Sequence, residues 1–284
     1  MRTFGAQSMV APLHEVMVKR PGPAFGRAFD EPTHGFLRPV DLPRAQAEHD
    51  GFAAALRQLG VTVHELGVET YDPDLSYTFD ASLVTDRGAI LLRSGKATRL
   101  GEEAAHAAWY RERGIPVIGA IEGPGTVDGG DAFWIDPRTL CIGRTLRTNR
   151  AVGEQLAAVW GGDVRFYDVA YGEGPAKLIH LLSVISLVAE DLAVVYLPLL
   201  PVGLWELLRD RRIGLVEVPP EEFDSLGPNV LAVRPRVVVM AAGNPVTAAR
   251  LRDRGVEVRE VPLGEVGANG SGGPTCLTRP ILRG

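Results

Sequence analysis

A unit of one helix, one glycine and one apolar strand recurs five times in this chain, and this repeat constrains the fold more than any other feature. Amphipathic helices are predicted at residues 43–59, 102–113, 150–160, 204–212 and 247–254. Each ends near a glycine that can leave the helix in a left-handed conformation, namely Gly60, Gly114, Gly161, Gly214 and Gly255. The spacing of roughly 40 to 55 residues is typical of a repeat architecture.

Pairs of strands lie between these units. Residues 82–84 are predicted to pair with 89–92, and residues 230–233 with 237–240, while 178–196 is predicted as two apolar strands joined near Glu190. Modules with one helix each cannot bury their apolar faces alone, so we expect them to pack around a common axis as one domain over residues 1–284. A doubly wound sheet competes, but no G-x-G-x-x-G joins a strand to a helix.

The composition is that of a globular protein and disfavours several classes of partner. The 284 residues are 45% hydrophobic and 23% charged, with a net charge of −5 and no basic block. A nucleic-acid or anionic-membrane partner is therefore disfavoured. The N-terminus resembles no signal peptide, and the two cysteines favour a reducing, cytoplasmic location. His180 and Glu190 interrupt the apolar run 178–200, which argues against a membrane span. The sequence does not decide whether the protein forms a homodimer.

The C-terminal segment places a cysteine directly after a glycine cluster. Gly270, Gly272 and Gly273 let the backbone take positive φ and approach a ligand closely, and Cys276 then begins an apolar, strand-prone run. A loop of this kind presents a thiol, and we expect that thiol to react quickly with alkylating agents near neutral pH. The alternative is that Cys276 packs as a small buried hydrophobic residue. We interpret the other cysteine, Cys141, in this way.

Two acids and an imidazole accompany this thiol. Asp128 and Asp131 flank two glycines between apolar segments, so we expect enclosed carboxylates that need a cationic partner, although D-G also forms hairpin turns. His180 lies among aliphatic residues, where a hydrogen-bonded core histidine is the alternative. Together these groups suit a planar cation such as guanidinium, because paired carboxylates accept its forked N–H donors and a thiolate can attack its carbon.

Four other charged residues are ambiguous when taken alone. Asp80 ends the segment 77–80 just before a predicted strand. A carboxylate at such a position can cap or form a turn, or it can bind a ligand. Asp74, Arg99 and Arg147 each fit a solvated surface charge with little energetic consequence.

Five segments together resemble a known superfamily: GGPTCLTRPI, VDGGD, GRTLRTN, IHLLS and YTFDASLV. They are similar to the guanidino-modifying superfamily of the pentein fold, and most of all to the dimethylarginine dimethylaminohydrolases, from about residue 15 to 283. The resemblance implies an α/β fold, a five-bladed propeller of ββαβ repeats. It also implies a hydrolase of guanidinium C–N bonds that uses no metal and no cofactor and takes a small guanidino substrate.

Carried over by motif, the resemblance implies roles for the residues at the reacting end. Cys276 is the nucleophile, His180 is the general acid and base, and Asp128 orients the histidine or the guanidinium. Asp80 holds the guanidinium nitrogens, and Asp131 is a further substrate-binding acid. The thiolate attacks the guanidinium carbon, a thiouronium intermediate forms, and water releases a ureido product.

At the other end of the substrate, the resemblance implies an amino acid. Asp74 resembles the contact to the amino group, while Arg99 and Arg147 resemble clamps on the carboxylate. The segment 22–38, rich in Gly, Pro, His and Phe, reads as a long surface loop in the position of the family's substrate lid.

Two positions depart from the family pattern and leave alternatives open. Phe79 stands where methylarginine hydrolases usually carry a glutamate, so recognition of the amino end is open. Leu182 stands where arginine deiminases place a second aspartate, which argues against a deiminase of that type. The alternatives are an amidinotransferase, in which an amine resolves the same intermediate, a deiminase of another guanidino acid, and a non-catalytic propeller that binds through its surface.

Overall fold

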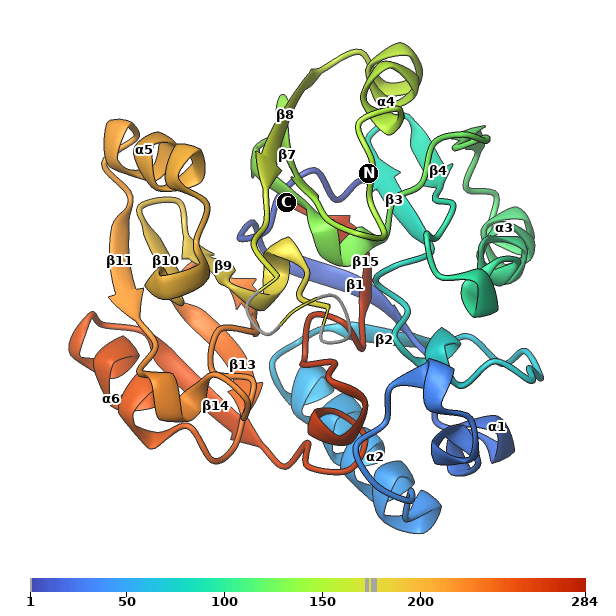
Figure 1. Ribbon diagram of the computed structural model, residues 1–284, viewed down its shortest axis with the longest axis horizontal. Coiled ribbons are helices and arrows are strands. Elements are labelled where there is room, and N and C mark those ends of the chain that lie inside the picture. The colour runs from blue at the N-terminus through green and yellow to red at the C-terminus, as the bar shows by residue number, and fades with distance from the viewer. Residues whose placement is uncertain (1, 172–173, 175–177) are drawn as a thin grey trace.

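Five three-stranded sheets surround a common axis in the computed structural model, which describes residues 2–171, 174 and 178–284 (Figure 1). Four sheets repeat one order of an antiparallel hairpin, a helix and a third, parallel strand. They comprise β3 (Ser82–Thr85), β4 (Gly88–Leu91), α3 (Glu102–Glu112) and β5 (Val117–Ala120); β6 (Ala132–Asp136), β7 (Thr139–Arg144), α4 (Val152–Trp160) and β8 (Asp163–Asp168); β9 (Ile185–Ala189), β10 (Leu192–Val195), α5 (Val202–Asp210) and β11 (Gly214–Glu217); and β12 (Val230–Arg234), β13 (Val237–Ala241), α6 (Pro245–Asp253) and β14 (Glu257–Val261).

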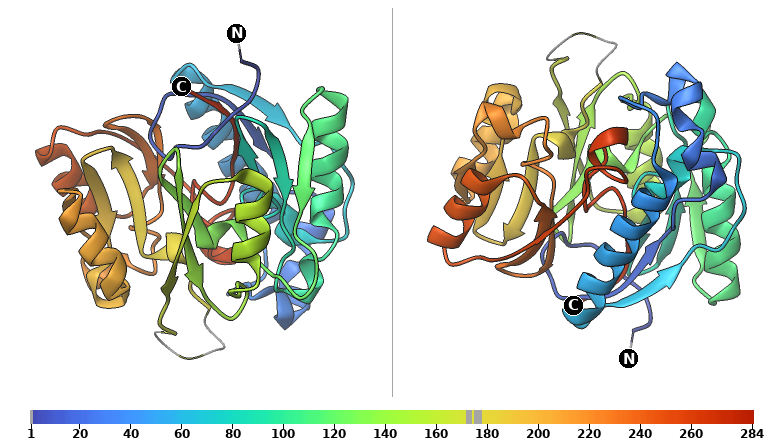
Figure 2. Two further views of the ribbon diagram at one scale, coloured as in Figure 1. Left: turned by 90° about the horizontal axis from the view of Figure 1, so that it is seen from above. Right: turned by 90° about the horizontal axis from the view of Figure 1, so that it is seen from below.

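The fifth sheet joins the two ends of the chain. β15 (Arg279–Arg283) pairs antiparallel with β1 (Leu13–Val18), and β1 runs parallel to β2 (Thr62–Glu65) after α2 (Leu42–Gln58). The last strand therefore supplies the hairpin partner that the first module lacks, and the ring closes. This arrangement confirms the predicted five-bladed α/β propeller of ββαβ repeats. Both views of Figure 2 place the termini on the face opposite α1 (Pro23–Gly26).

The five long helices lie on the outside of the ring, and each buries one face toward the sheets (Figure 1). In α4, Val152, Leu156 and Trp160 are buried four residues apart on one face. They pack with Leu140 and Ile142 of β7 in one hydrophobic cluster. Complete burial of such a side chain contributes about 1.5–3 kcal/mol, which fixes each helix to its blade.

Four of the five long helices are followed by the predicted left-handed glycine, at Gly60, Gly114, Gly161 and Gly255, with φ between 66° and 87°. The prediction for α5 is wrong, because the left-handed residue there is Arg212 at φ 57° and Gly214 already begins β11. A residue with a Cβ pays roughly 1–2 kcal/mol for this conformation, so the geometry of the turn overrides the local preference.

Two further segments differ from the prediction. The first strand predicted in 178–196 begins only at Ile185, because Leu181–Ser183 forms a 3-10 turn and the His180 N–H donates to Ser183 Oγ at 3.0 Å. The predicted surface loop 22–38 contains α1 and two 3-10 turns instead of irregular chain. Its Phe25 ring is buried and packs edge-on against Phe36 and Tyr77 at 5.1 and 6.2 Å between centroids.

In the part of the chain that the structure describes, no helix is both long and apolar enough to span a bilayer.

Candidate active site

Four predicted site residues lie in loops that precede the first strand of a blade. Asp80 comes before β3, Asp131 before β6, His180 before β9 and Cys276 before β15, at one to five residues from the strand. β12 contacts β9 and β15 contacts β3 near the axis, and the loops before the first strands lie on one face of the ring (Figure 1). The loop before β12 ends at Asn229, which was not predicted as a site residue. Its place in the repeat is the signal that would have found it.

The nucleophile loop is built around a contact between Cys276 and Asn229. Asn229 Nδ2 donates to the Cys276 sulfur at 3.3 Å, and the Thr275 N–H donates to Asn229 Oδ1 at 3.0 Å. Gly273 permits this approach, since a Cβ there would lie 2.4 Å from Asn229 Oδ1. The predicted positive φ of the glycine cluster is wrong, because the left-handed residue of this loop is Ser271 at φ 61°. The glycines serve close packing instead.

The Cys276 thiol is neutral near pH 7 in the free protein. Burial and the nearby Asp80 carboxylate raise its pKa to about 11, although hydrogen bonds from Gly273 and Asn229 oppose this shift. Such a pKa weighs against rapid alkylation near neutral pH in the absence of a bound cation. A cation bound beside the sulfur favours the thiolate, so a guanidinium substrate would help to ionise its own nucleophile.

His180 is supported by Asp131. The His180 Nδ1 atom lies 3.2 Å from Asp131 Oδ2, an ion-pair distance, although the two groups lack the alignment of a hydrogen bond. Burial alone would lower the histidine pKa, but the charges of Asp131 and Asp80 outweigh it and raise the pKa above its ordinary value. The imidazole is therefore biased toward its protonated form, which suits a general acid.

Asp131 has no visible role in substrate contact. Its Oδ2 accepts hydrogen bonds from Thr145 Oγ1 at 2.7 Å and Thr148 Oγ1 at 2.6 Å, and its Oδ1 accepts from the Leu181 N–H at 3.0 Å. These contacts assign Asp131 to holding the His180 imidazole, and not to the substrate contact that was predicted for it. Of the two roles left open for Asp128, orientation of the histidine belongs better to Asp131, because Asp128 Oδ2 lies 4.0 Å from His180 Nε2.

Asp128 is fully buried and faces two loops. Its Oδ2 pairs with Arg147 Nη1 at 3.3 Å, and its Oδ1 accepts from the Gly95 N–H at 3.3 Å. The Arg147 side chain keeps a quarter of its surface exposed, so it can reach a ligand as the sequence analysis expects. The loops that carry Gly95 and Arg147 touch, since a Cβ on Gly95 would lie 2.2 Å from the Arg147 carbonyl oxygen.

The segment Phe79-Asp80 is joined by hydrogen bonds to both the acidic loop and the nucleophile loop. The Gly130 N–H donates to Asp80 Oδ1 at 2.6 Å, and the neighbouring Phe79 N–H donates to the Cys276 carbonyl at 3.1 Å. A Cβ on Gly130 would lie 3.1 Å from the His180 ring. The structure thus brings the thiol, the imidazole and the acids into one cluster.

Arg99 is occupied inside the protein, contrary to the expectation of a carboxylate clamp. Its Nη1 pairs with Asp80 Oδ2 at 2.5 Å, and its Nε and Nη2 donate to both oxygens of Glu102 at 2.9 and 2.8 Å. The remaining bonds run to the carbonyls of Asp74 and Tyr77. Burial opposes ionisation of Asp80, but Arg99, His180 and the Gly130 N–H outweigh it and hold the Asp80 pKa below its usual value.

Asp74 is paired with two cationic side chains that the sequence analysis missed. Lys96 Nζ lies 2.5 Å from Asp74 Oδ2, and His34 Nδ1, from the segment predicted as a lid, lies 3.3 Å from the same oxygen. Burial opposes ionisation of Asp74, but His34, Arg99 and Lys96 outweigh it and lower the Asp74 pKa. His34, Asp72 and Asp74 have the spacing of metal ligands, and the Lys96 ammonium already pairs with one Asp74 oxygen, Oδ2.

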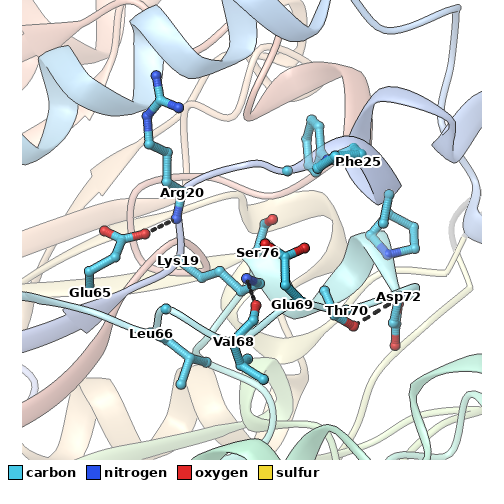
Figure 3. Close-up of a pocket in the computed structure, with 15 residues that line it drawn as sticks. Lys19, Arg20, Phe25, Glu65, Leu66, Val68, Glu69, Thr70, Asp72 and Ser76 are labelled. Atoms are coloured by element: carbon cyan, nitrogen blue, oxygen red, sulfur yellow. Dashed lines mark hydrogen bonds between the residues drawn. The ribbon is translucent and has the colours of Figure 1, made fainter.

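A cavity of about 170 Å³ lies beside this cluster and is lined by other residues (Figure 3). It backs onto the 3-10 turn Pro73–Ser76, which carries Asp74. At its base, Lys19 Nζ donates to the Val68 carbonyl at 2.6 Å. None of the eight predicted site residues lines this cavity, so it is separate from the candidate active site.

Known proteins match this sequence and this fold. The family model described as arginine deiminase matches residues 200–283. A dimethylarginine dimethylaminohydrolase of Streptomyces coelicolor is 30% identical over 270 residues, covering 94% of this chain and 96% of that protein. The chain belongs to the dimethylarginine dimethylaminohydrolase family. This family consists of amidine hydrolases of the pentein superfamily, so the protein is an enzyme of that class.

Solved structures of this superfamily share the fold. The dimethylarginine dimethylaminohydrolase of Pseudomonas aeruginosa, solved as a cysteine-to-serine variant with citrulline, superposes with a TM-score of 0.79 at 24% identity, covering 95% of this chain and all of that one. The N-terminal domain of ArgZ, a cyanobacterial arginine dihydrolase bound covalently to a reaction intermediate, gives a TM-score of 0.83 at 20% identity, covering 95% and 98%.

Proposed function

We propose that this protein hydrolyses the guanidinium C–N bond of an arginine-like substrate through a covalent intermediate on Cys276. The observation that carries the proposal is that the segment Phe79-Asp80 joins two loops: the Phe79 N–H donates to the Cys276 carbonyl, and the Asp80 carboxylate accepts from the Gly130 N–H beside His180. We further propose that residues 1–284 act as one domain, which the pairing of β15 with β1 supports.

Binding of the guanidinium uses the acids of the cluster. Asp80 and Asp128 are buried carboxylates. Each can accept more hydrogen bonds than the protein donors around it supply. A planar cation between them would donate its N–H groups to these oxygens and lie with its carbon toward the Cys276 sulfur. Its charge would offset the effect of Asp80 on the thiol and favour the thiolate.

The reaction then proceeds in two displacements. The Cys276 thiolate attacks the guanidinium carbon, and protonated His180 gives its proton to the departing amine as the C–N bond breaks. The product of this step is a thiouronium on Cys276. His180, now neutral, takes one proton from water as the oxygen attacks the same carbon. The C–S bond then breaks, the ureido oxygen loses the second proton of the water to solvent, and a neutral ureido group and the thiolate remain. Nω-methylated arginine would give citrulline and a methylamine, which is dimethylamine for the dimethylarginine in the name of the Streptomyces relative.

A deiminase is the second candidate, because the arginine deiminase model matches residues 200–283. It uses the same nucleophile and the same intermediate, but the departing group is ammonia from an unsubstituted guanidinium. Leu182 stands where arginine deiminases place a second aspartate, which weighs against an arginine deiminase. Whether an amine or ammonia departs is shown by identifying the released product. An amidinotransferase differs only in the final acceptor, which would be an amine.

The test is a screen of methylated and unmethylated guanidino compounds for ureido product, with the released amine or ammonia identified. Cys276→Ser is expected to lower kcat by at least about a thousandfold, because a hydroxyl at this site lacks the acidity of a thiol. Cys141→Ser, in the buried core, is the matched control and is expected to keep its activity. Wild-type activity of Cys276→Ser contradicts the mechanism. Consumption of an added amine in place of water identifies a transferase, and no reaction with any of these compounds contradicts the proposed substrate class.

A further inference from the structure

The Asp74 carboxylate is neutralised by the protein itself. Lys96 Nζ lies 2.5 Å from Asp74 Oδ2, and the two side chains are only 11% and 6% exposed. A second group, His34 Nδ1, lies 3.3 Å from the same oxygen, and contact with Asp74 raises the His34 pKa. A buried ion pair of this kind is costly to break, because either partner alone would be a desolvated charge.

This pair lies at the end of the candidate site away from the thiol. The Asp74 carbonyl accepts a hydrogen bond from Arg99 Nη2, and the other arm of Arg99 reaches Asp80, so Asp74 is one guanidinium group away from Asp80. Lys96 follows Gly95, whose N–H binds Asp128 and whose backbone touches that of Arg147. Lys96 and Arg147 therefore belong to adjoining loops that both face the acids of the cluster.

The charges at this end suit a carboxylate better than an ammonium. A substrate ammonium that approached Asp74 would have to displace Lys96 from its carboxylate or join it there, beside a His34 whose pKa is raised. The neighbouring Asp72 carboxylate offsets this less than a free acid would, because burial and Asp74 raise its pKa. A substrate carboxylate would meet attraction instead. The Lys96 ammonium has three N–H donors, and within the described residues two of them are used, by Asp74 Oδ2 and the His34 carbonyl at 3.2 Å. Arg147 offers a second cation on the adjoining loop.

We propose that the preferred substrate is an ω-guanidino acid whose far end carries a carboxylate and no free ammonium, and that Lys96 determines this specificity. The inference rests on the proposed hydrolysis of a guanidinium and narrows it to one substrate class. Under it, Asp74 holds Lys96 in place and does not bind the amino group that the family resemblance implies.

The test compares L-arginine with 5-guanidinopentanoate, which has the same length and carboxylate but lacks the α-ammonium, together with the Nω-methyl derivative of each. The wild-type protein is expected to show a kcat/KM at least about tenfold higher for the compounds without the ammonium. Lys96→Met keeps the length of the side chain and removes its charge, and it is expected to lower this preference at least about tenfold. Lys19→Met, at a buried lysine outside the cluster, is the matched control and is expected to leave the preference unchanged.

Binding to Cys276→Ser, measured by calorimetry with the same compounds, separates this inference from the proposed reaction. If no compound gives a ureido product, the proposed reaction fails, and tighter binding of 5-guanidinopentanoate to the wild-type and serine proteins still supports the inference. If products form but arginine is preferred tenfold, or if Lys96→Met leaves the preference unchanged, the inference is wrong and the reaction stands. Equal binding of both compounds also overturns it.

Discussion

The two ends of the candidate site hold their carboxylates in different ways. At the reacting end, Asp80 shares Arg99 with Glu102, and Glu102 takes two hydrogen bonds of that guanidinium. At the far end, Asp74 is the carboxylate that pairs with Lys96, and His34 adds to it. The Arg99 guanidinium divides its donors between Asp80 and Glu102, and burial raises the Glu102 pKa well above its usual value. By contrast, Lys96 and His34 both approach a single oxygen of Asp74. The two carboxylates therefore differ in how their own partners hold them before a substrate cation arrives.

Matched asparagine substitutions at the two ends give the largest expected difference. Asp80→Asn is expected to lower kcat/KM about a thousandfold without unfolding the chain, because the guanidinium loses its charged partner. Asp74→Asn is expected to lower the thermal stability, because Lys96 loses its buried charged partner, but to lower kcat/KM less than about fivefold, since the proposal gives Asp74 no contact with the substrate and the asparagine oxygen can still hold Lys96. Steady-state kinetics on the best guanidino substrate and thermal unfolding check both. A loss of a hundredfold or more in folded Asp74→Asn would show that the two ends bind cations alike.

Asp131→Asn tests the support of the histidine and is expected to lower kcat about a hundredfold. Asp131 helps to raise the His180 pKa against the effect of burial, so the neutral amide lowers that pKa. Less imidazolium is then present at neutral pH, and the alkaline limb of the kcat profile moves to lower pH. The pH dependence of kcat measures this shift. The exposed variant Asp163→Asn, which removes only a surface pair with Arg165, is the control, and an unmoved limb in Asp131→Asn contradicts the assignment.

The fold was largely predictable because its signals are local. The apolar period and the following glycine place α2 at residues 43–59, and the structure has Leu42–Gln58. The failure at Arg212 has a physical reason, since the turn after α5 keeps its left-handed geometry without a glycine. The pairing of β15 with β1 joins the two ends of the chain, and local patterns alone do not specify a contact at such a separation.

The site was predictable only where motifs or the repeat mark it. The Asp-Gly-Gly-Asp segment identifies Asp128 and Asp131, but their division of labour follows from the side-chain contacts of Thr145 and Thr148, which no spacing reveals. Lys96 belongs to no periodic pattern and to no motif. Its pairing with Asp74 is visible only when the fold brings their two loops together. Asn229 lies between these cases, because its position before β12 repeats that of the catalytic residues in the other blades.

The smallest expected effect separates the chemistry of the thiol from the binding of the cation. Asp80 helps to raise the Cys276 pKa to about 11, so Asp80→Asn, although inactive, is expected to speed alkylation of Cys276 at pH 8 about threefold. Iodoacetamide labelling with peptide mass spectrometry measures this rate. Cys141, fully buried with its pKa raised to about 12, is the control within the same molecule and is expected to stay unlabelled. Slower labelling of Cys276 in a folded variant would mean that Asp80 does not act on the thiol at the reacting end.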